Sequence, residues 1–200
     1  MAKLNRAKRL FSVKIVYYGP GLSGKTTNLE RLHEIYAEQQ RGELVKLATE
    51  TERTLFFDYM PAHLGKLSGF DLKADLFTVP GQSFYHSTRK VVLEGADGVV
   101  FVADSHPRRE EANIDAMQSL RENLKSYGRS IDDVPVVVQY NKRDLPSAMP
   151  LATMQRVLNP DGLPHLEASS LTGEGVLDTQ ERILQLVLDH LREQSRRQRA

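Results

Sequence analysis

The sequence predicts an α/β fold: a mostly parallel sheet of six strands, with one antiparallel pair and helices on both faces. Residues 98–104 and 134–140 form continuous apolar runs, the pattern of strands that are buried on both faces. Amphipathic helical patterns alternate with such runs, as in folds where helices carry the chain back between parallel strands. No repeat or low-complexity linker divides the 200 residues, so we expect one domain.

The expected strands span residues 13–18, 55–60, 70–79, 98–104, 134–140 and 165–168. The second and third are joined by a turn that contains Pro61, Gly65 and Gly69, and we expect this pair to be antiparallel. The polar stretch 43–54 is expected to form a loop or an irregular arm. Apolar residues at helical spacing predict helices over 26–36, through 89–93, and over 117–127, 153–158 and 183–191.

Composition narrows the function. The formal charge of +1 gives no global field that would favour nucleic acid. The chain has no cysteine, which excludes disulfides, thiol catalysis, thiolate zinc sites and lipid attachment through a thiol. No apolar run approaches the 18 residues of a membrane span, and Ala2 does not fit the myristoylation pattern. We therefore expect a cytosolic protein.

Both ends of the chain are basic. We expect residues 1–10 and 193–200 to be mobile tails that flank one domain over 11–192. The alternative is a weak peripheral contact of these tails with anionic lipid. The basic residues of the two ends are Lys3, Arg6, Lys8, Arg9, Arg192, Arg196, Arg197 and Arg199.

Residues 19–27 follow the first strand and match the phosphate-loop pattern G-x-x-x-x-G-K-[ST]. In this pattern, backbone N–H groups and a helix N-terminus surround the phosphates, the lysine contacts the outer phosphates, and the Thr26 hydroxyl can bind Mg²⁺. The alternative is a glycine turn that only joins a strand to a helix. The expected phosphate-binding residues are Gly19, Gly21, Leu22, Ser23, Gly24, Lys25, Thr26 and Thr27.

A second motif, Asn141-Lys142-Arg143-Asp144, directly follows a predicted buried strand. Ligands of α/β sheets bind beyond the carboxyl ends of the strands, where this motif lies. The Asp144 carboxylate can accept hydrogen bonds from N1–H and the exocyclic amine of guanine, whereas adenine offers no such pair of donors. The motif therefore favours GTP or GDP over adenine nucleotides.

With these two motifs the chain resembles the Ras-like small GTPases, and most closely their MglA-like bacterial branch of gliding-motility and cell-polarity proteins. The resemblance runs from about residue 14 to 191 and is most specific over 14–29, 51–58, 78–82 and 139–146. It implies a Ras-like fold, binding of GTP or GDP with Mg²⁺, and slow hydrolysis of GTP.

The resemblance also assigns roles to individual residues. Thr54 would reach Mg²⁺ when the γ-phosphate is present, Gln82 would orient the attacking water, and Gly81 would offer its N–H to the γ-phosphate. Ser170 and Leu171 fall where the family has its last guanine-contacting loop, although Ser169-Ser170-Leu171 departs from the common Ser-Ala-Lys.

Arg53 resembles an arginine that is thought to act as an intrinsic arginine finger in MglA-like proteins. Such a group can contribute a rate factor on the order of 10³–10⁵. The alternative is an exposed arginine that pairs with Glu50 or Glu52.

One position departs from the wider superfamily. Thr78 stands where most Ras-like proteins have the aspartate that holds a Mg²⁺-bound water. Asp104 could supply this missing charge, or it could be a strand-end residue that caps the following segment.

The sequence thus predicts a slow GTPase that works as a two-state switch. By resemblance its activating partner is a roadblock-fold homodimer like MglB, and its effectors are unidentified. A GTP-loaded scaffold with negligible hydrolysis is the alternative, which Gln82 and Arg53 oppose. An ATP-dependent kinase or ATPase is opposed by Asn141 and Asp144.

Overall fold

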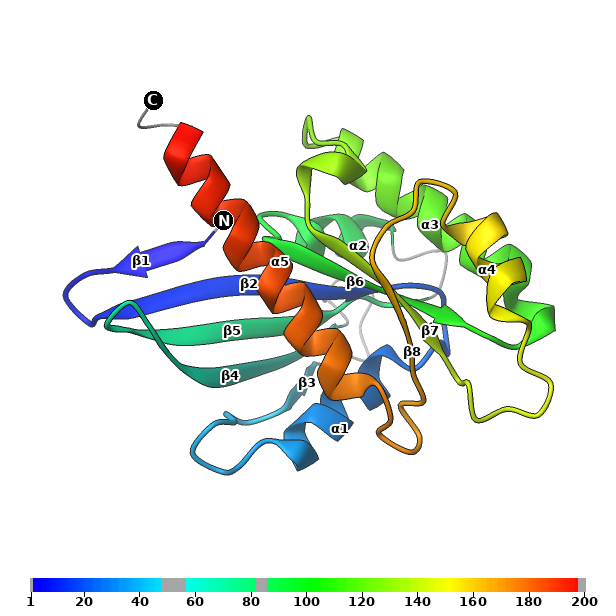
Figure 1. Ribbon diagram of the computed structural model, residues 1–200, viewed down its shortest axis with the longest axis horizontal. Coiled ribbons are helices and arrows are strands. Elements are labelled where there is room, and N and C mark those ends of the chain that lie inside the picture. Colours follow the sequence, from blue (N-terminus) through cyan, green and yellow to red (C-terminus); the bar gives the residue numbers. More distant parts are fainter. Residues whose placement is uncertain (1, 48–56, 82–85, 198–200) are drawn as a thin grey trace.

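A twisted sheet forms the centre of the molecule (Figure 1). The computed structural model describes residues 2–47, 57–81 and 86–197. Within them the sheet has eight strands in the order β3-β4-β5-β2-β6-β7-β8, and β1 pairs with β2. Strands β5, β2, β6, β7 and β8 are parallel to one another, whereas the pairs β1/β2, β3/β4 and β4/β5 are antiparallel.

The strands are β1 (Lys3–Asn5), β2 (Leu10–Tyr18), β3 (Val45–Leu47), β4 (Phe57–Leu67), β5 (Phe70–Thr78), β6 (Gly98–Asp104), β7 (Val136–Asn141) and β8 (His165–Glu167). The helices are α1 (Lys25–Ile35), α2 (His86–Leu93), α3 (Glu110–Lys125), α4 (Leu151–Leu158) and α5 (Val176–Arg197), with the short 3₁₀ helices η1 (Pro107–Arg109) and η2 (Ile131–Asp133). The predicted α/β fold class is confirmed, and all six predicted strands are present. The sheet also contains β1 and β3, which add two antiparallel pairs to the one predicted, and β3 lies in the stretch expected to be a loop.

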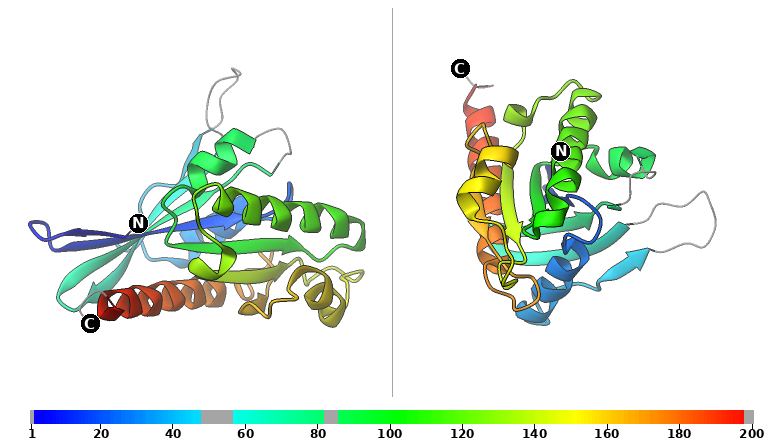
Figure 2. Two further views of the ribbon diagram at one scale, coloured as in Figure 1. Left: turned by 90° about the horizontal axis from the view of Figure 1, so that it is seen from above. Right: turned by 90° about the vertical axis from the view of Figure 1, so that its right-hand side faces the viewer.

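The helices cover both faces of the sheet (Figure 2). Helices α1 and α5 pack on one face through Leu29, Leu32, Ile183 and Val187. Helices α2, α3 and α4 pack on the other face, where their apolar side chains meet the alternate residues of the same strands. Because successive side chains of a strand point to opposite faces, each parallel strand contributes to both cores.

Strand β4 is longer than predicted. It continues through Pro61 to Leu67, and the chain reverses at Ser68 and Gly69, which have φ values of 50° and 85°. Positive φ at both central residues is the geometry of a two-residue hairpin turn. The carbonyl of Pro61 accepts a hydrogen bond from the N–H of Gly42, at 2.8 Å, on the side away from β5. Because the nitrogen and the carbonyl of a strand residue face the same side, the missing N–H of Pro61 removes no hydrogen bond to β5.

The chain ends also differ from the expected mobile tails. Residues 3–5 form β1, which pairs with Leu10–Ser12, the part of β2 that extends past its pairing with β6. This segment of β2 has a free edge, and β1 satisfies its backbone groups. At the other end α5 continues to Arg197, so residues 193–197 are helical.

Candidate functional site

The candidate site lies at the carboxyl ends of β2, β6 and β7, where three loops meet. These loops are the phosphate loop after β2, residues 105–109 after β6, and residues 142–144 after β7. Because the three strands are parallel neighbours, their carboxyl ends share one edge of the sheet. The topology thus brings together the two motifs that the sequence predicts to bind a nucleotide.

Close approach of other groups explains two of the three glycines of the phosphate loop. Gly19 and Gly24 have φ values of 143° and 99°, a region that favours glycine. A Cβ atom at Gly19 would lie 2.3 Å from the carbonyl oxygen of Val102, and one at Gly24 would lie 2.3 Å from Nδ2 of Asn141. The loop is therefore shaped by contacts with β6 and β7 as well as by its own turn.

The N-terminus of α1 is open to an anion. The helix begins at Lys25, its N-cap Gly24 provides no side-chain hydrogen bond, and its first turn contains no acidic residue. The first N–H groups of a helix lack partners within the helix, and together with the helix dipole they favour bound negative charge. This arrangement fits a phosphate group.

Lys25 is buried beneath the loop, with 6% of its surface exposed. Its Nζ donates hydrogen bonds to the carbonyl oxygens of Pro20, at 2.6 Å, and Gly19, at 3.1 Å. Burial lowers the pKa of Lys25 to about 7, and the positive charges of Arg89 and Arg109 add to this effect, whereas Asp58 opposes it. A phosphate beside Lys25 would favour the charged ammonium form.

Gly81 lies directly against the phosphate loop. A Cβ atom at Gly81 would be 2.2 Å from Cα of Gly21. The segment after β5 therefore packs against the phosphate loop at Gly21. The predicted catalytic residues Gln82 and Arg53, and the predicted Mg²⁺ ligand Thr54, lie outside the described residues.

Asp58 is a site residue that the sequence interpretation missed. Its Oδ2 accepts hydrogen bonds from the hydroxyls of Thr26, at 2.6 Å, and Thr78, at 2.8 Å, and its backbone N–H donates to Oγ1 of Thr78. The β4/β5 register could have found it, because the pairing of Tyr59 with Phe77 places Asp58 opposite Thr78.

These three residues fit a magnesium site. Mg²⁺ prefers oxygen ligands and is commonly held by one or two protein groups together with substrate phosphates and waters. Hydroxyl and carboxylate oxygens of Thr26, Asp58 and Thr78 lie together, next to the phosphate loop. In the described part of the chain no group of three or more His, Cys, Asp or Glu residues could hold a metal by itself.

Asp104 does not supply the carboxylate beside Thr26. Its Oδ2 accepts a hydrogen bond from Nζ of Lys142, at 2.7 Å, and lies 3.8 Å from Nε of Arg109. Its Oδ1 accepts from the backbone N–H of His106, at 3.0 Å. Of the two alternatives for Asp104, the geometry favours a strand-end residue that caps the following turn.

The loop after β7 is tied to both neighbouring loops through Asn141, which is fully buried. Its Nδ2 donates to the carbonyl oxygen of Ser23, at 2.7 Å, and to Oγ of Ser170, at 3.0 Å. The backbone N–H of Ser170 donates to Oδ1 of Asn141, at 2.8 Å. We call the loop after β7, with Asn141 at its start, the base loop. The phosphate loop, the base loop and the loop that contains Ser170 therefore form one connected unit.

Leu171 and Asp144 remain accessible at this unit. Leu171 is 68% exposed, and its carbonyl oxygen accepts a hydrogen bond from Arg31 of α1, another residue that the sequence interpretation missed. Asp144 is exposed, and its carboxylate has no hydrogen-bond partner among the described residues. A carboxylate in this position is available to accept hydrogen bonds from a base.

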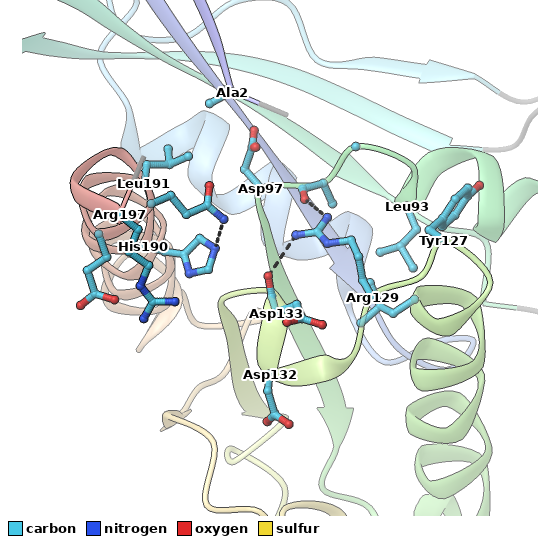
Figure 3. A pocket seen from close by; sticks show the side chains of 15 residues that line it. Ala2, Leu93, Asp97, Tyr127, Arg129, Asp132, Asp133, His190, Leu191 and Arg197 are labelled. Carbon is cyan, nitrogen blue, oxygen red and sulfur yellow. Dashed lines mark hydrogen bonds between the residues drawn. The ribbon is translucent and has the colours of Figure 1, made fainter. Parts of the chain in front are cut away.

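A cavity of about 960 Å³ lies at the opposite end of the molecule, near the amino ends of β6 and β7 (Figure 3). Its lining mixes charges of both signs, including Asp97, Asp132, Arg129 and Arg197. Arg129 donates hydrogen bonds to the carbonyl oxygens of Ala96 and Asp133, so it ties together the segments that precede β6 and β7. This cavity is remote from the phosphate loop.

Together, the parallel sheet, the phosphate loop and the connected base loop define a Ras-like P-loop GTPase. Comparison with known proteins identifies the family. The family model described as "ADP-ribosylation factor family" matches residues 1–187. The chain is 48% identical to the mutual gliding-motility protein MglA of Myxococcus xanthus. The 192 matched residues make up 96% of this chain and 98% of the relative.

More distant relatives belong to the same class. Human ADP-ribosylation factor-like protein 4C is 24% identical over 185 residues, 88% of each chain. Ras-related protein Rab-4 of Dictyostelium discoideum is 26% identical over 171 residues, which is 84% of this chain and 76% of the relative. The chain therefore belongs to the Arf family of small GTPases, as an MglA-like bacterial member.

Members of this family bind guanine nucleotides and hydrolyse GTP, so the chain is a GTPase. None of the helices in the described residues is both long and apolar enough to span a membrane.

Proposed function

We propose that this protein is a molecular switch that binds GTP or GDP with Mg²⁺ at the connected loops and slowly hydrolyses GTP. The observation that carries this proposal is the hydrogen bond from Nδ2 of Asn141 to the carbonyl oxygen of Ser23. It joins the predicted base loop to the phosphate loop. One ligand that contains both a base and phosphates can therefore occupy the two loops together.

The proposed contacts follow from the site. Phosphates bind residues 19–27 with Lys25 beneath them, and Asp144 accepts the hydrogen bonds of guanine. Ser170 positions Asn141, and Leu171 borders the base. The hydroxyl of Thr26 would bind Mg²⁺, with Asp58 holding that hydroxyl in place and Thr78 holding Asp58. Mg²⁺ neutralises developing charge on the phosphates when it is bound.

Hydrolysis is proposed to depend on Gln82 and Arg53. Gln82 orients the attacking water, and Arg53 stabilises the charge that develops on the transferred phosphoryl group. In GTPases of this type the γ-phosphate and Mg²⁺ order the switch segments, which hydrolysis releases. We propose that the segments containing Thr54 and Gln82 are these switches.

The proposed activating partner is a roadblock-fold homodimer like MglB, which repositions the switches and inserts no arginine of its own. One relative is named a gliding-motility protein, and this name supports a role in bacterial motility or cell polarity. We propose a cytoplasmic protein that its partners recruit to a cell pole or to a membrane surface.

A direct membrane contact is a further part of this proposal. Figure 1 shows the β1–β2 turn, the β4–β5 turn and the end of α5 at one end of the molecule. A groove of about 590 Å³ is lined there by Phe11, Leu67 and Leu191, with Arg192 and Arg196 at its side. Apolar surface flanked by basic residues fits weak binding to anionic lipid.

Single-turnover hydrolysis tests the catalytic proposal. Intrinsic turnover of GTPases of this type is about 10⁻⁴–10⁻² per second, and we expect the roadblock homodimer to raise the rate at least tenfold. Arg53→Ala should retain GTP affinity but lose most of this stimulation, because the finger acts on the transition state. Unchanged stimulated turnover of Arg53→Ala would show that Arg53 is an ordinary surface residue.

A further inference from the structure

Asp104, at the end of β6, is a buried carboxylate between the phosphate loop and the base loop. Only 1% of its surface is exposed. Its backbone is held by Asn113 of α3, whose Oδ1 accepts from the Asp104 N–H and whose Nδ2 donates to the Asp104 carbonyl oxygen, both at 2.9 Å. The carboxylate is therefore fixed in position before any ligand binds.

Two cations from different loops meet this carboxylate. Nζ of Lys142 donates to Oδ2 at 2.7 Å, and Nε of Arg109 lies 3.8 Å from the same oxygen. The guanidinium of Arg109 extends further, and its Nη2 donates to the carbonyl oxygen of Gly21 at 2.6 Å. A chain of charged contacts therefore runs from Lys142 in the base loop, through Asp104 and Arg109, to Gly21 in the phosphate loop.

We propose that Asp104 and Arg109 are positioning residues that couple the base loop to the outer end of the phosphate loop. This inference rests on the proposed nucleotide site and adds to it a second connection, independent of Asn141. Asn141 holds the loop at Ser23, whereas Arg109 holds it at Gly21, against which Gly81 also packs. Arg109 thereby fixes the part of the loop that faces the segment after β5.

The chemistry explains why these residue types are needed. A guanidinium has several N–H donors in a rigid fork, so it can face the carboxylate with one edge and donate to a carbonyl with another. A lysine at position 109 would keep the charge but has one compact ammonium group. The negative charge of Asp104 also lies between two cations, Lys142 and Arg109, that would otherwise repel each other.

Release of a fluorescent GDP analogue from the Mg²⁺-loaded protein tests this inference. We expect Asp104→Asn and Arg109→Gln each to accelerate release about tenfold, because Arg109→Gln removes the donor to the Gly21 carbonyl and Asp104→Asn removes the charge that holds Arg109 in place. The double variant should release GDP at nearly the rate of Asp104→Asn alone, since both residues act through one chain of contacts. Lysine should replace this arginine only in part: on a logarithmic scale, Arg109→Lys should show more than half of the acceleration of GDP release that Arg109→Gln shows.

Arg108→Gln is the matched control, because Arg108 is exposed and adjacent and its guanidinium makes no hydrogen bond among the described residues. It should release GDP within twofold of the wild-type rate. Thermal melting of the GDP-loaded variants checks folding, and Arg109→Gln provides the test if Asp104→Asn does not fold.

The inference would be overturned if Arg109→Gln released GDP at the wild-type rate, or if the double variant were accelerated by the product of the two single factors. It would also be overturned if Arg109→Lys released GDP at the wild-type rate, because this would indicate a role of charge alone. If the wild-type protein bound no GDP analogue, the proposed function itself would fail together with this inference.

Discussion

At the scale of single residues, buried and partly buried charges surround the proposed nucleotide site. Lys25, Arg89 and Arg109 bring positive charge to the phosphate loop, and Asp58 and Asp104 are the carboxylates that partly balance it. A nucleotide brings further negative charge, so it completes a site whose cations are held close together. Two measurable consequences follow, one for protons and one for Mg²⁺.

Nucleotide affinity should depend on pH through Lys25. Its pKa in the free protein is about 7, well below the ordinary 10.5, and bound phosphates should raise it. Between pH 7 and the higher pKa of the complex, binding takes up a proton, so affinity falls as pH rises, by at most about tenfold per unit. Below pH 7 Lys25 is already protonated in the free protein, so the affinity no longer depends on pH through this group.

Calorimetric titration with GDP at pH 6.5, 7.5 and 8.5, in buffers of different ionisation enthalpy, measures this uptake directly. Proton uptake should be small at the lowest pH and approach one proton at the highest. An affinity that is flat across this range would contradict the proposed contact of Lys25 with phosphate.

Mg²⁺ affinity should depend on Asp58. Its carboxylate accepts a hydrogen bond from the Thr26 hydroxyl at 2.6 Å, which directs the lone pairs of that hydroxyl oxygen away from Asp58 and leaves them available to a cation. Loss of a group that orients a ligand typically costs 10–100-fold in metal affinity. We therefore expect Asp58→Asn to raise the Mg²⁺ concentration that half-maximally slows GDP release by about tenfold or more.

Asp71→Asn is the control for Asp58→Asn, because Asp71 is an exposed acid at the start of β5, far from Thr26. Equal Mg²⁺ dependence of both variants and the wild type would remove Asp58 from the metal site.

Sequence motifs predicted the residues with a fixed local pattern. Residues 19–27 and 141–144 lie together as expected, because each motif follows a strand and the parallel topology aligns the strand ends. Asp58, Arg31 and Arg109 could not be found in this way. Each of them reaches the site from a separate element, so its role depends on tertiary contacts. For Asp58 it also depends on the register of β4 against β5.

At the scale of elements, hydrophobic patterns predicted the strands that are buried on both faces. The apolar run of β6 was assigned with the bounds that the structure has, since a continuous apolar segment that ends in Asp104 is a strong signal. Strands β1 and β3 have three residues each and are not distinguished by composition. They form because neighbouring strands offer free edges, a property of the assembled sheet.

The packing of α5 on the sheet depends on a glycine. A Cβ atom at Gly98, the first residue of β6, would lie 2.5 Å from Cγ2 of Val187 and 3.1 Å from Cδ1 of Ile183. Gly98→Ala should therefore lower the free energy of unfolding by about 1–3 kcal/mol through overpacking. Urea unfolding of the GDP-loaded protein at fixed GDP concentration measures this loss.

Val187→Ala provides the matched control for Gly98→Ala. It removes the atom that the new methyl group meets, so the double variant should lose less stability than the sum of the two single variants. Additive losses would show that α5 does not pack against Gly98 in this way.

At the scale of the whole molecule, the proposed nucleotide site and the basic chain ends lie at opposite ends of the sheet. Strand β2 begins beside the β1–β2 turn and ends at the phosphate loop. If the basic end contacts a membrane, the phosphate loop and the segment after β5 face away from it and remain accessible to a partner.

Vesicle flotation tests the membrane contact with the GDP-loaded protein. Each basic residue near an anionic surface contributes about 1 kcal/mol, so Arg196→Gln/Arg197→Gln should weaken binding to vesicles with 30 mol % phosphatidylglycerol roughly 25-fold. The control Arg108→Gln/Arg156→Gln changes exposed residues elsewhere and should have little effect. Absence of wild-type binding, or equal losses in both variants, would exclude this contact.

We propose that two loops joined by Asn141 form one site for a guanine nucleotide. The most direct measurement is competition of GDP, ADP and xanthosine diphosphate against a fluorescent GDP analogue, for the wild type and for Asp144→Asn. Xanthine carries a carbonyl oxygen where guanine carries its exocyclic amine, so an asparagine N–H can pair with xanthine whereas a carboxylate cannot.

We predict that the wild type prefers GDP over ADP by at least a hundredfold, since loss of two charge-assisted hydrogen bonds costs about 3 kcal/mol or more. Asp144→Asn should lose GDP affinity by a similar factor and gain affinity for xanthosine diphosphate. Comparable binding of ADP and GDP by the wild type, or an unchanged preference in Asp144→Asn, would contradict the account.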